Sequence, residues 1–171
     1  MLFQDGSTHA WLCGQPALDL IVTLDDATGE IYSAFLVEEE GTLSSFRGLG
    51  EVIARKGLFG SLYTDRGSHY FLTPKAGEAV DTVQLTQVGR ALKHLGIQHI
   101  ASYSPQGRGR MERVFGTLQG RLPQMLRLAG INTIEEANRY LAEVYVGEHN
   151  ARFAVEAAEP TPGAPRRLWR R

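Results

Sequence analysis

The sequence predicts an α/β fold: a mixed five-stranded sheet with an antiparallel hairpin at one edge and helices on both faces. Strand-like and helix-like stretches follow in the order of three strands, helix, strand, helix, strand and then helices. Strands joined through helices run parallel and strands joined by a tight turn run antiparallel, so this order gives a mixed sheet. With 171 residues, 43% of them apolar, the chain can bury one substantial core.

The first third of the chain is predicted to hold three strands. Residues 2–4 form a very short strand that ends in an acidic turn at Asp5. Residues 17–24 alternate with the period of two that is typical of a strand, and residues 31–37 form a second long strand. The turn-forming segment at residues 25–29 joins these two long strands into a hairpin.

Helices and strands alternate in the middle of the chain. Residues 42–56 place apolar side chains three and four positions apart, which indicates a helix. Residues 61–64 are predicted to form a short strand, and residues 71–87 a loop. A helix at 88–95 and a strand at 98–101 follow.

The last third is predicted to be helical. After a loop at residues 104–109, a helix runs from about 110 to 128, and Pro123 should kink or divide it. Thr133 opens a last helix through a capping box, and this helix reaches about Val146.

Composition divides the chain into a folded unit at residues 1–150 and a basic, Pro-rich tail at 151–171 that we expect to be disordered. The formal net charge of −1 gives no bulk attraction for nucleic acid. Arginines nevertheless gather in the second half of the chain, where a polyanion would meet it. They are Arg108, Arg110, Arg113, Arg121, Arg127, Arg166, Arg167, Arg170 and Arg171.

Several classes of protein are excluded or disfavoured. The single cysteine, Cys13, excludes a disulfide framework or a thiolate metal site within one chain. The first residues lack the basic and apolar regions of a signal peptide, and no apolar run approaches the ~20 residues of a membrane-spanning helix. We therefore expect a cytosolic protein with no membrane partner.

Two carboxylates stand at positions that suit chemistry. Asp65 follows a predicted strand, and Glu112 lies just past a Gly- and Arg-rich loop where a helix begins, so the two can meet across one cleft. Clustered carboxylates bind a hard divalent cation, and arginines bind phosphates. On position alone, the ordinary roles of a turn residue for Asp65 and a first-turn helix acid for Glu112 are favoured over a catalytic role, because such roles are common.

Three motifs together resemble the catalytic core of retroviral-integrase-type DDE transposases, and within them insertion-sequence transposases of the ISNCY kind. The motifs are Gln4-Asp-Gly-Ser-Thr-His-Ala-Trp11, Asp65-Arg-Gly-Ser-His-Tyr-Phe71 and Ser104-Pro-Gln-Gly-Arg-Gly-Arg-Met-Glu-Arg113. The resemblance covers about residues 2–150 and implies an RNase H-like fold, which agrees with the predicted order of elements.

The resemblance implies a role for each matched residue. Asp5, Asp65 and Glu112 would be the catalytic and metal-binding acids, and would hold two Mg²⁺ or Mn²⁺ ions. The reaction would be phosphodiester cleavage followed by strand transfer, with transposon ends and target DNA as partners. Gln106, Arg108, Arg110 and Arg113 would contact DNA. A homo-oligomer is left open.

Two other functions remain in view. The chain could be a truncated, non-catalytic remnant that acts at most as a nucleic-acid-binding or dimerising module. It could also be an RNase H-like nuclease that hydrolyses DNA without joining it. Retention of all three acids favours the transposase.

Overall fold

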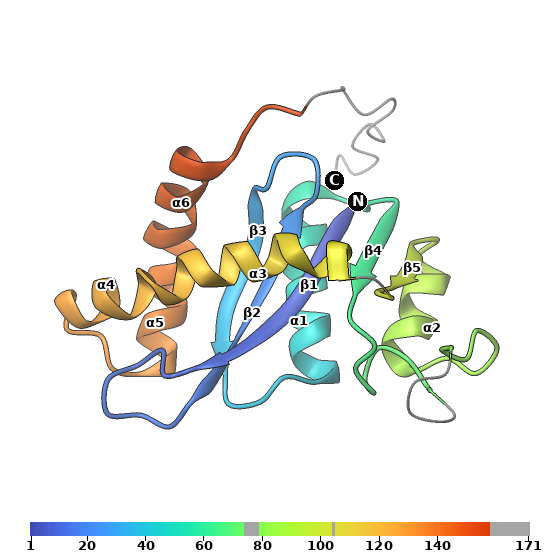
Figure 1. Cartoon of the computed structure of the whole chain (residues 1–171), viewed down its shortest axis with the longest axis horizontal. Coiled ribbons are helices and arrows are strands. Elements are labelled where there is room, and N and C mark those ends of the chain that lie inside the picture. The colour runs from blue at the N-terminus through green and yellow to red at the C-terminus, as the bar shows by residue number, and fades with distance from the viewer. Residues whose placement is uncertain (74–78, 104, 158–171) are drawn as a thin grey trace.

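A five-stranded sheet forms the centre of the molecule in the computed structural model, which describes residues 1–73, 79–103 and 105–157 (Figure 1). The strands are β1 (Leu2–His9), β2 (Leu18–Asp25), β3 (Ile31–Val37), β4 (Ser61–Thr64) and β5 (Gln98–Ala101). Their spatial order is β3-β2-β1-β4-β5. The β1–β2 and β2–β3 pairs are antiparallel, whereas β1–β4 and β4–β5 are parallel. The predicted mixed sheet is confirmed.

Helices cover both faces of this sheet, as predicted (Figure 1). They are α1 (Thr42–Lys56), α2 (Gln87–His94), α3 (Pro105–Gln119), α4 (Leu122–Leu128), α5 (Ile134–Tyr140), the π-helical turn η1 (Leu141–Tyr145) and α6 (Val146–Phe153). None of the described helices is both long and apolar enough to span a membrane.

The core is split into two layers by the sheet. On one face, side chains of β1 to β3 such as Phe3 and Leu36 pack with α3, α4 and α5, and the fully buried Trp11 belongs to this layer. On the other face, Leu2 and Leu62 pack with α1 and α2. Because neighbouring strand residues point to opposite faces, Leu2 and Phe3 enter different layers.

The first strand differs from its prediction. We expected a short strand that ends before Asp5, but β1 continues to His9 and lies at the centre of the sheet. It pairs with β2 along its whole length, from Leu2 opposite Asp25 to His9 opposite Leu18. This long antiparallel ladder outweighs the local tendency of an Asp-Gly pair to turn.

The helices differ from their predictions in their ends. The backbone is helical from Pro105, where a loop was expected up to 109, because proline suits the first position of a helix. Pro123 does divide the next stretch, since α4 begins anew at Leu122. The last helical segment runs to Phe153, past the predicted end near Val146 and the predicted boundary at 150. Residues 158–171 of the predicted tail lie outside the described residues.

Candidate active site

The parallel register of β1 and β4 brings two of the three predicted acids together. Phe3 pairs with Tyr63, so the residues two positions further along each chain are Asp5 and Asp65. Neighbouring strands lie about 4.8 Å apart, and a step of two returns to the same face of the sheet. Asp5 and Asp65 accordingly line one small cleft, together with Ser102 and Met111.

Local hydrogen bonds orient both carboxylates. The backbone N–H of Gly67 donates to Oδ1 of Asp65 at 2.9 Å, and that of Gly6 donates to Oδ1 of Asp5 at 3.0 Å. A side chain at position 67 would come within 3.1 Å of the same Asp65 oxygen. Because glycine has no side chain, the Asp65 carboxylate can occupy its position in the turn.

Helix α3 closes the cleft with a side chain next to the third predicted acid. Met111 is 2% exposed and lines the cleft beside Asp5 and Asp65. Glu112 follows Met111, about 100° further around the helix, and is exposed. No three His, Cys, Asp or Glu side chains of the described residues are close enough together to hold a metal ion. The structure thus brings Asp5 and Asp65 together, whereas Glu112 follows the cleft-lining Met111 on α3 and does not itself line the cleft.

The predicted DNA-binding residues fall into two groups. Arg110 forms an ion pair with Asp26, at 3.0 Å between Nη1 and Oδ1, and also donates to the Asp26 carbonyl. Arg113 is exposed and donates through Nε to the carbonyl of Gly109 at 3.1 Å. The side chains of Gln106 and Arg108 lie outside the described residues. The proposed DNA contacts of all four stay predictions.

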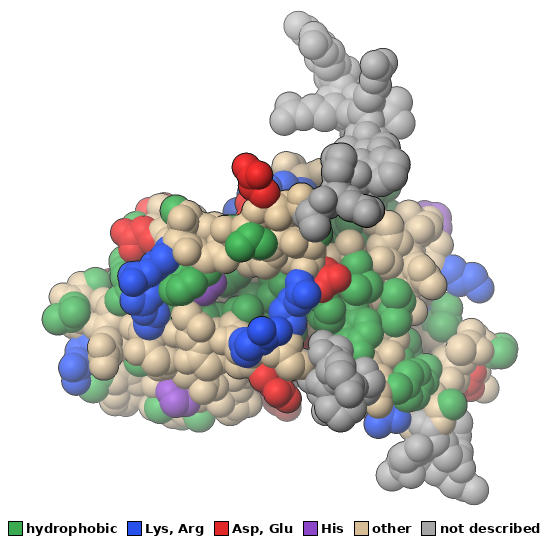
Figure 2. Space-filling model, turned by 45° about the horizontal axis from the view of Figure 1, so that its top comes forward, with side chains coloured by type: hydrophobic (Ala, Val, Ile, Leu, Met, Phe, Trp, Pro, Cys, Tyr) green, Lys and Arg blue, Asp and Glu red, His purple; other side chains and the backbone are tan. Residues whose placement is uncertain are grey.

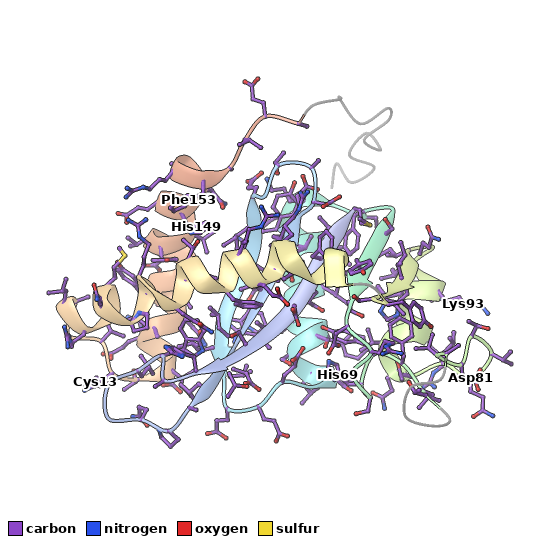
Figure 3. All side chains as sticks on the ribbon, in the orientation of Figure 1. Cys13, His69, Asp81, Lys93, His149 and Phe153 are labelled. Atoms are coloured by element: carbon purple, nitrogen blue, oxygen red, sulfur yellow. The ribbon has the colours of Figure 1, made fainter. Side chains whose placement is uncertain are left out.

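Glu40 and His69 come together near the cleft. Their side chains are 24% and 17% exposed, and Glu40 Oε1 lies 3.5 Å from His69 Nε2. A Cβ at Gly6 would lie 2.3 Å from Glu40 Oε2, so this glycine makes room for the carboxylate. His69 lies on the loop after β4 (Figure 3). No local sequence pattern indicated this contact.

A buried hydrogen-bond network supports Asp5 from the opposite face of the sheet. Gln4 is 1% exposed; its Nε2 donates to Thr23 Oγ1 at 3.0 Å, and its Oε1 accepts from the hydroxyl of Tyr70 at 2.9 Å. Burial raises the pKa of Tyr70, and the charges of Glu40, Asp65 and Asp5 raise it further. Tyr70 is therefore a permanent donor to the residue that precedes Asp5.

His99 on β5 is held neutral behind the cleft. Its ring stacks on Phe71 with 4.1 Å between centroids, and its Nε2 lies 3.1 Å from Thr64 Oγ1, next to Asp65. Burial lowers the pKa of His99 from 6.5 to about 4. The ring is therefore an uncharged packing and hydrogen-bonding group at neutral pH.

We expect the protein to lose stability on acidification because of His99. Between about pH 6.5 and 4 the unfolded chain binds a proton at this position that the folded chain does not, so folding stability falls as pH falls through this range. Partial exposure limits the loss to about 2 kcal/mol. Urea unfolding at pH 7 and pH 5 measures it. His99→Gln should flatten the dependence, whereas the same change at the exposed His94 should not.

The sequence is related to transposases along most of its own length. It is 35% identical over 156 residues to the putative transposase y4bF of Sinorhizobium fredii, and 32% identical over 153 residues to the transposase for insertion sequence IS1202 of Streptococcus pneumoniae. Each match covers 90% of this chain, which spans about a third of the length of these relatives (33% and 32%). No protein-family model matches the chain.

The fold is that of retroviral integrase catalytic cores. The structure is similar to the HTLV-2 integrase catalytic core domain in complex with magnesium, with a TM-score of 0.57 and 16% identity over 84% of this chain and 87% of that one. The BIV integrase catalytic core gives a TM-score of 0.56 and 20% identity, with 84% of both chains covered. A chain of the simian T-cell lymphotropic virus intasome gives 0.60 and 21%, over 84% and 49%. The RNase H-like fold is confirmed, as is the resemblance to integrase-type transposases; the ISNCY subtype stays a prediction.

Proposed function

We propose that this chain, a relative of transposases with the integrase catalytic-core fold, is the catalytic core of a DDE transposase that cuts and joins DNA. The observation that carries the proposal is the juxtaposition of Asp5 and Asp65 in one cleft, set by the register of β1 and β4. Both residues stand where the matched family motifs have acids. Two oriented carboxylates, one on β1 and one directly after β4, can hold a divalent cation, and such a cation neutralises the oxygens of a phosphodiester substrate.

The residues present fit a divalent cation. Mg²⁺ is usually bound by one or two carboxylates, with water and substrate phosphate as the other ligands, and Asp5 and Asp65 supply such a pair. Glu112 would complete the set from α3. Two ions bound at these acids would stabilise the charge on the attacking and leaving oxygens of an in-line displacement.

The chain's own residues position the acids and shape the cleft. The Gly67 and Gly6 amides orient the carboxylates, while Met111 supplies an apolar wall that keeps water from the buried side. Glu40 lies against Gly6 and adds negative charge next to the pair. We propose that Arg113 binds a phosphate of the DNA backbone, since its guanidinium is exposed on the same helix as Glu112.

One observation favours the non-catalytic alternative. Glu112 does not form a three-carboxylate group with Asp5 and Asp65 within the described part of the chain. If Glu112 never joins the pair, the chain would retain the fold and act at most as a nucleic-acid-binding or dimerising module. Binding of metal decides between the two, because only the catalytic reading requires it.

Metal binding should raise the melting temperature. We expect Mn²⁺ or Mg²⁺ to stabilise the wild-type chain, because a ligand that binds only the folded state shifts the unfolding equilibrium. Asp65→Asn should remove this gain. Without metal, the same change should be neutral or stabilising, because it removes repulsion between neighbouring carboxylates. Differential scanning fluorimetry across a metal titration measures both effects.

The matched control is Glu39→Gln. Glu39 is exposed, is next to Glu40 and does not line the cleft, so this variant should keep the full metal response. An identical melting temperature with and without metal in the wild type would favour the remnant. A metal gain that survives Asp65→Asn would show that the ions bind elsewhere.

A further inference from the structure

A second cavity, at the far end of α3 from the cleft, is lined by basic and aromatic side chains. Its volume is about 320 Å³, and it lies where α4 and α6 approach the end of α3. The lining includes Arg121, Tyr145, Glu148, His149, Arg152 and Phe153. Figure 3 places His149 and Phe153 on α6, and Figure 2 shows Lys and Arg side chains gathered over this side of the surface. None of the proposed catalytic residues lines this cavity.

Two guanidinium groups converge on one aromatic ring in this cavity. The guanidinium carbon of Arg121 lies 5.4 Å from the ring centre of Phe153, and that of Arg152 lies 5.6 Å from it. Neither arginine forms an ion pair with another residue in the described part of the chain. A guanidinium packed on a ring keeps N–H donors at its edge, and these match the oxygens of a phosphate.

Neighbouring titratable groups respond to the charge of Arg121. Burial lowers the pKa of His149, and Arg121 lowers it further, so the ring is neutral at pH 7. Burial raises the pKa of Tyr145 to about 12, against the opposite influence of Arg121. The cavity wall thus holds two cations, a neutral imidazole and a phenol that can donate. Glu148 is the carboxylate that faces them.

We propose that this cavity binds a backbone phosphate of a nucleic-acid strand, held between Arg121 and Arg152. The choice of DNA as the ligand rests on the proposed function, because a DNA-processing core must also bind parts of its substrate that are distant from the reacting phosphate. The volume admits a phosphate with part of its sugar. Two guanidinium groups without an ion pair among the described residues give the cavity a net positive charge despite Glu148. The site is an anchor for DNA and takes no part in the chemistry.

The test measures DNA affinity without metal, so that it does not depend on catalysis. Fluorescence anisotropy with a short labelled DNA duplex in EDTA should show about fivefold weaker binding for Arg121→Gln and for Arg152→Gln. Each change should also reduce the slope of log Kd against log salt by about 1, because one phosphate contact is lost. Glu148→Gln should tighten binding, since it removes the opposing charge.

Two exposed residues nearby provide matched controls. Arg127→Gln on α4 changes the net charge as Arg121→Gln does, and Glu143→Gln on η1 changes it as Glu148→Gln does. Neither Arg127 nor Glu143 lines the cavity, so both control variants should bind DNA like the wild type. Equal weakening by Arg127→Gln and Arg121→Gln would overturn the proposal in favour of a diffuse charge effect. The proposal would also be overturned if Glu148→Gln did not tighten DNA binding.

A further arm separates DNA from a small anion. Inorganic pyrophosphate is added to the wild type and to Arg121→Gln. If it raises the melting temperature of the wild type alone, while the two proteins bind DNA with the same affinity, the cavity binds a free phosphate compound instead of DNA. Failure of the proposed catalytic function would look different: metal would not stabilise the chain, while DNA binding in EDTA would still depend on Arg121 and Arg152.

Discussion

Asp5→Asn and Asp65→Asn are each expected to reduce DNA cleavage and joining by at least about 100-fold while leaving the protein folded. An amide has almost the shape of a carboxylate but lacks its charge, so it cannot neutralise a divalent cation. Asp5 lies on β1 and Asp65 directly follows the adjacent strand β4, and the two share a cleft, so neither can replace the other. Gel assays with labelled DNA ends of the element and Mg²⁺ measure cleaved and joined products separately.

The same assay distinguishes the remaining hypotheses. Glu112→Gln should be as damaging as the other two changes if α3 delivers its carboxylate to the cleft. Glu39→Gln should retain full activity, because Glu39 is exposed and outside the cleft. Wild-type activity in Asp65→Asn would refute the assignment of this residue. Cleaved products without joined ones would support a nuclease.

Gln4→Ala should lower the free energy of unfolding by about 2–4 kcal/mol. The change empties a fully buried site and leaves the hydroxyl of Tyr70, a residue that is 1% exposed, without its acceptor. It also removes the hydrogen bond to Thr23. Urea unfolding followed by fluorescence measures the loss.

A pair of glycines on α1 provides the control. A Cβ at Gly48 would lie 2.4 Å from Nε2 of Gln4, so Gly48→Ala should destabilise by about 1–3 kcal/mol. A Cβ at Gly50 meets no atom within 4 Å, so Gly50→Ala should stabilise by up to about 1 kcal/mol. If both glycines tolerated alanine equally, Gln4 would not be tightly packed against α1.

Most of the elements could be predicted because the periodicity of apolar residues and the turn-forming residues that mark them lie within each short stretch of sequence. The helix Thr42–Lys56 and the strands Ile31–Val37, Ser61–Thr64 and Gln98–Ala101 have the ends that the sequence indicated. The first strand was misjudged, because Asp5-Gly6 has the composition of a turn and only its pairing with β2 keeps it extended. Long-range pairing of this kind leaves no trace in a single stretch of sequence.

The candidate site was predictable in part for the same reason. Motif resemblance pointed to Asp5 and Asp65, and the register of two strands brings them to one cleft. The contact of Glu40 with Gly6 depends on the path of the chain after β3, which no local pattern reports. The position of the Glu112 side chain depends on how α3 is rotated about its axis, and Met111 occupies the inward direction.

The alternation along β1 makes stability and chemistry inseparable. A slip of one residue against β2 would turn the Gln4 amide into the cleft and bury the Asp5 charge among apolar side chains of the opposite layer. Misaligned chains would therefore be unstable and would also lose the arrangement of the proposed catalytic acids. Selection for a folded protein alone thus guards the proposed catalytic pair against errors of alignment.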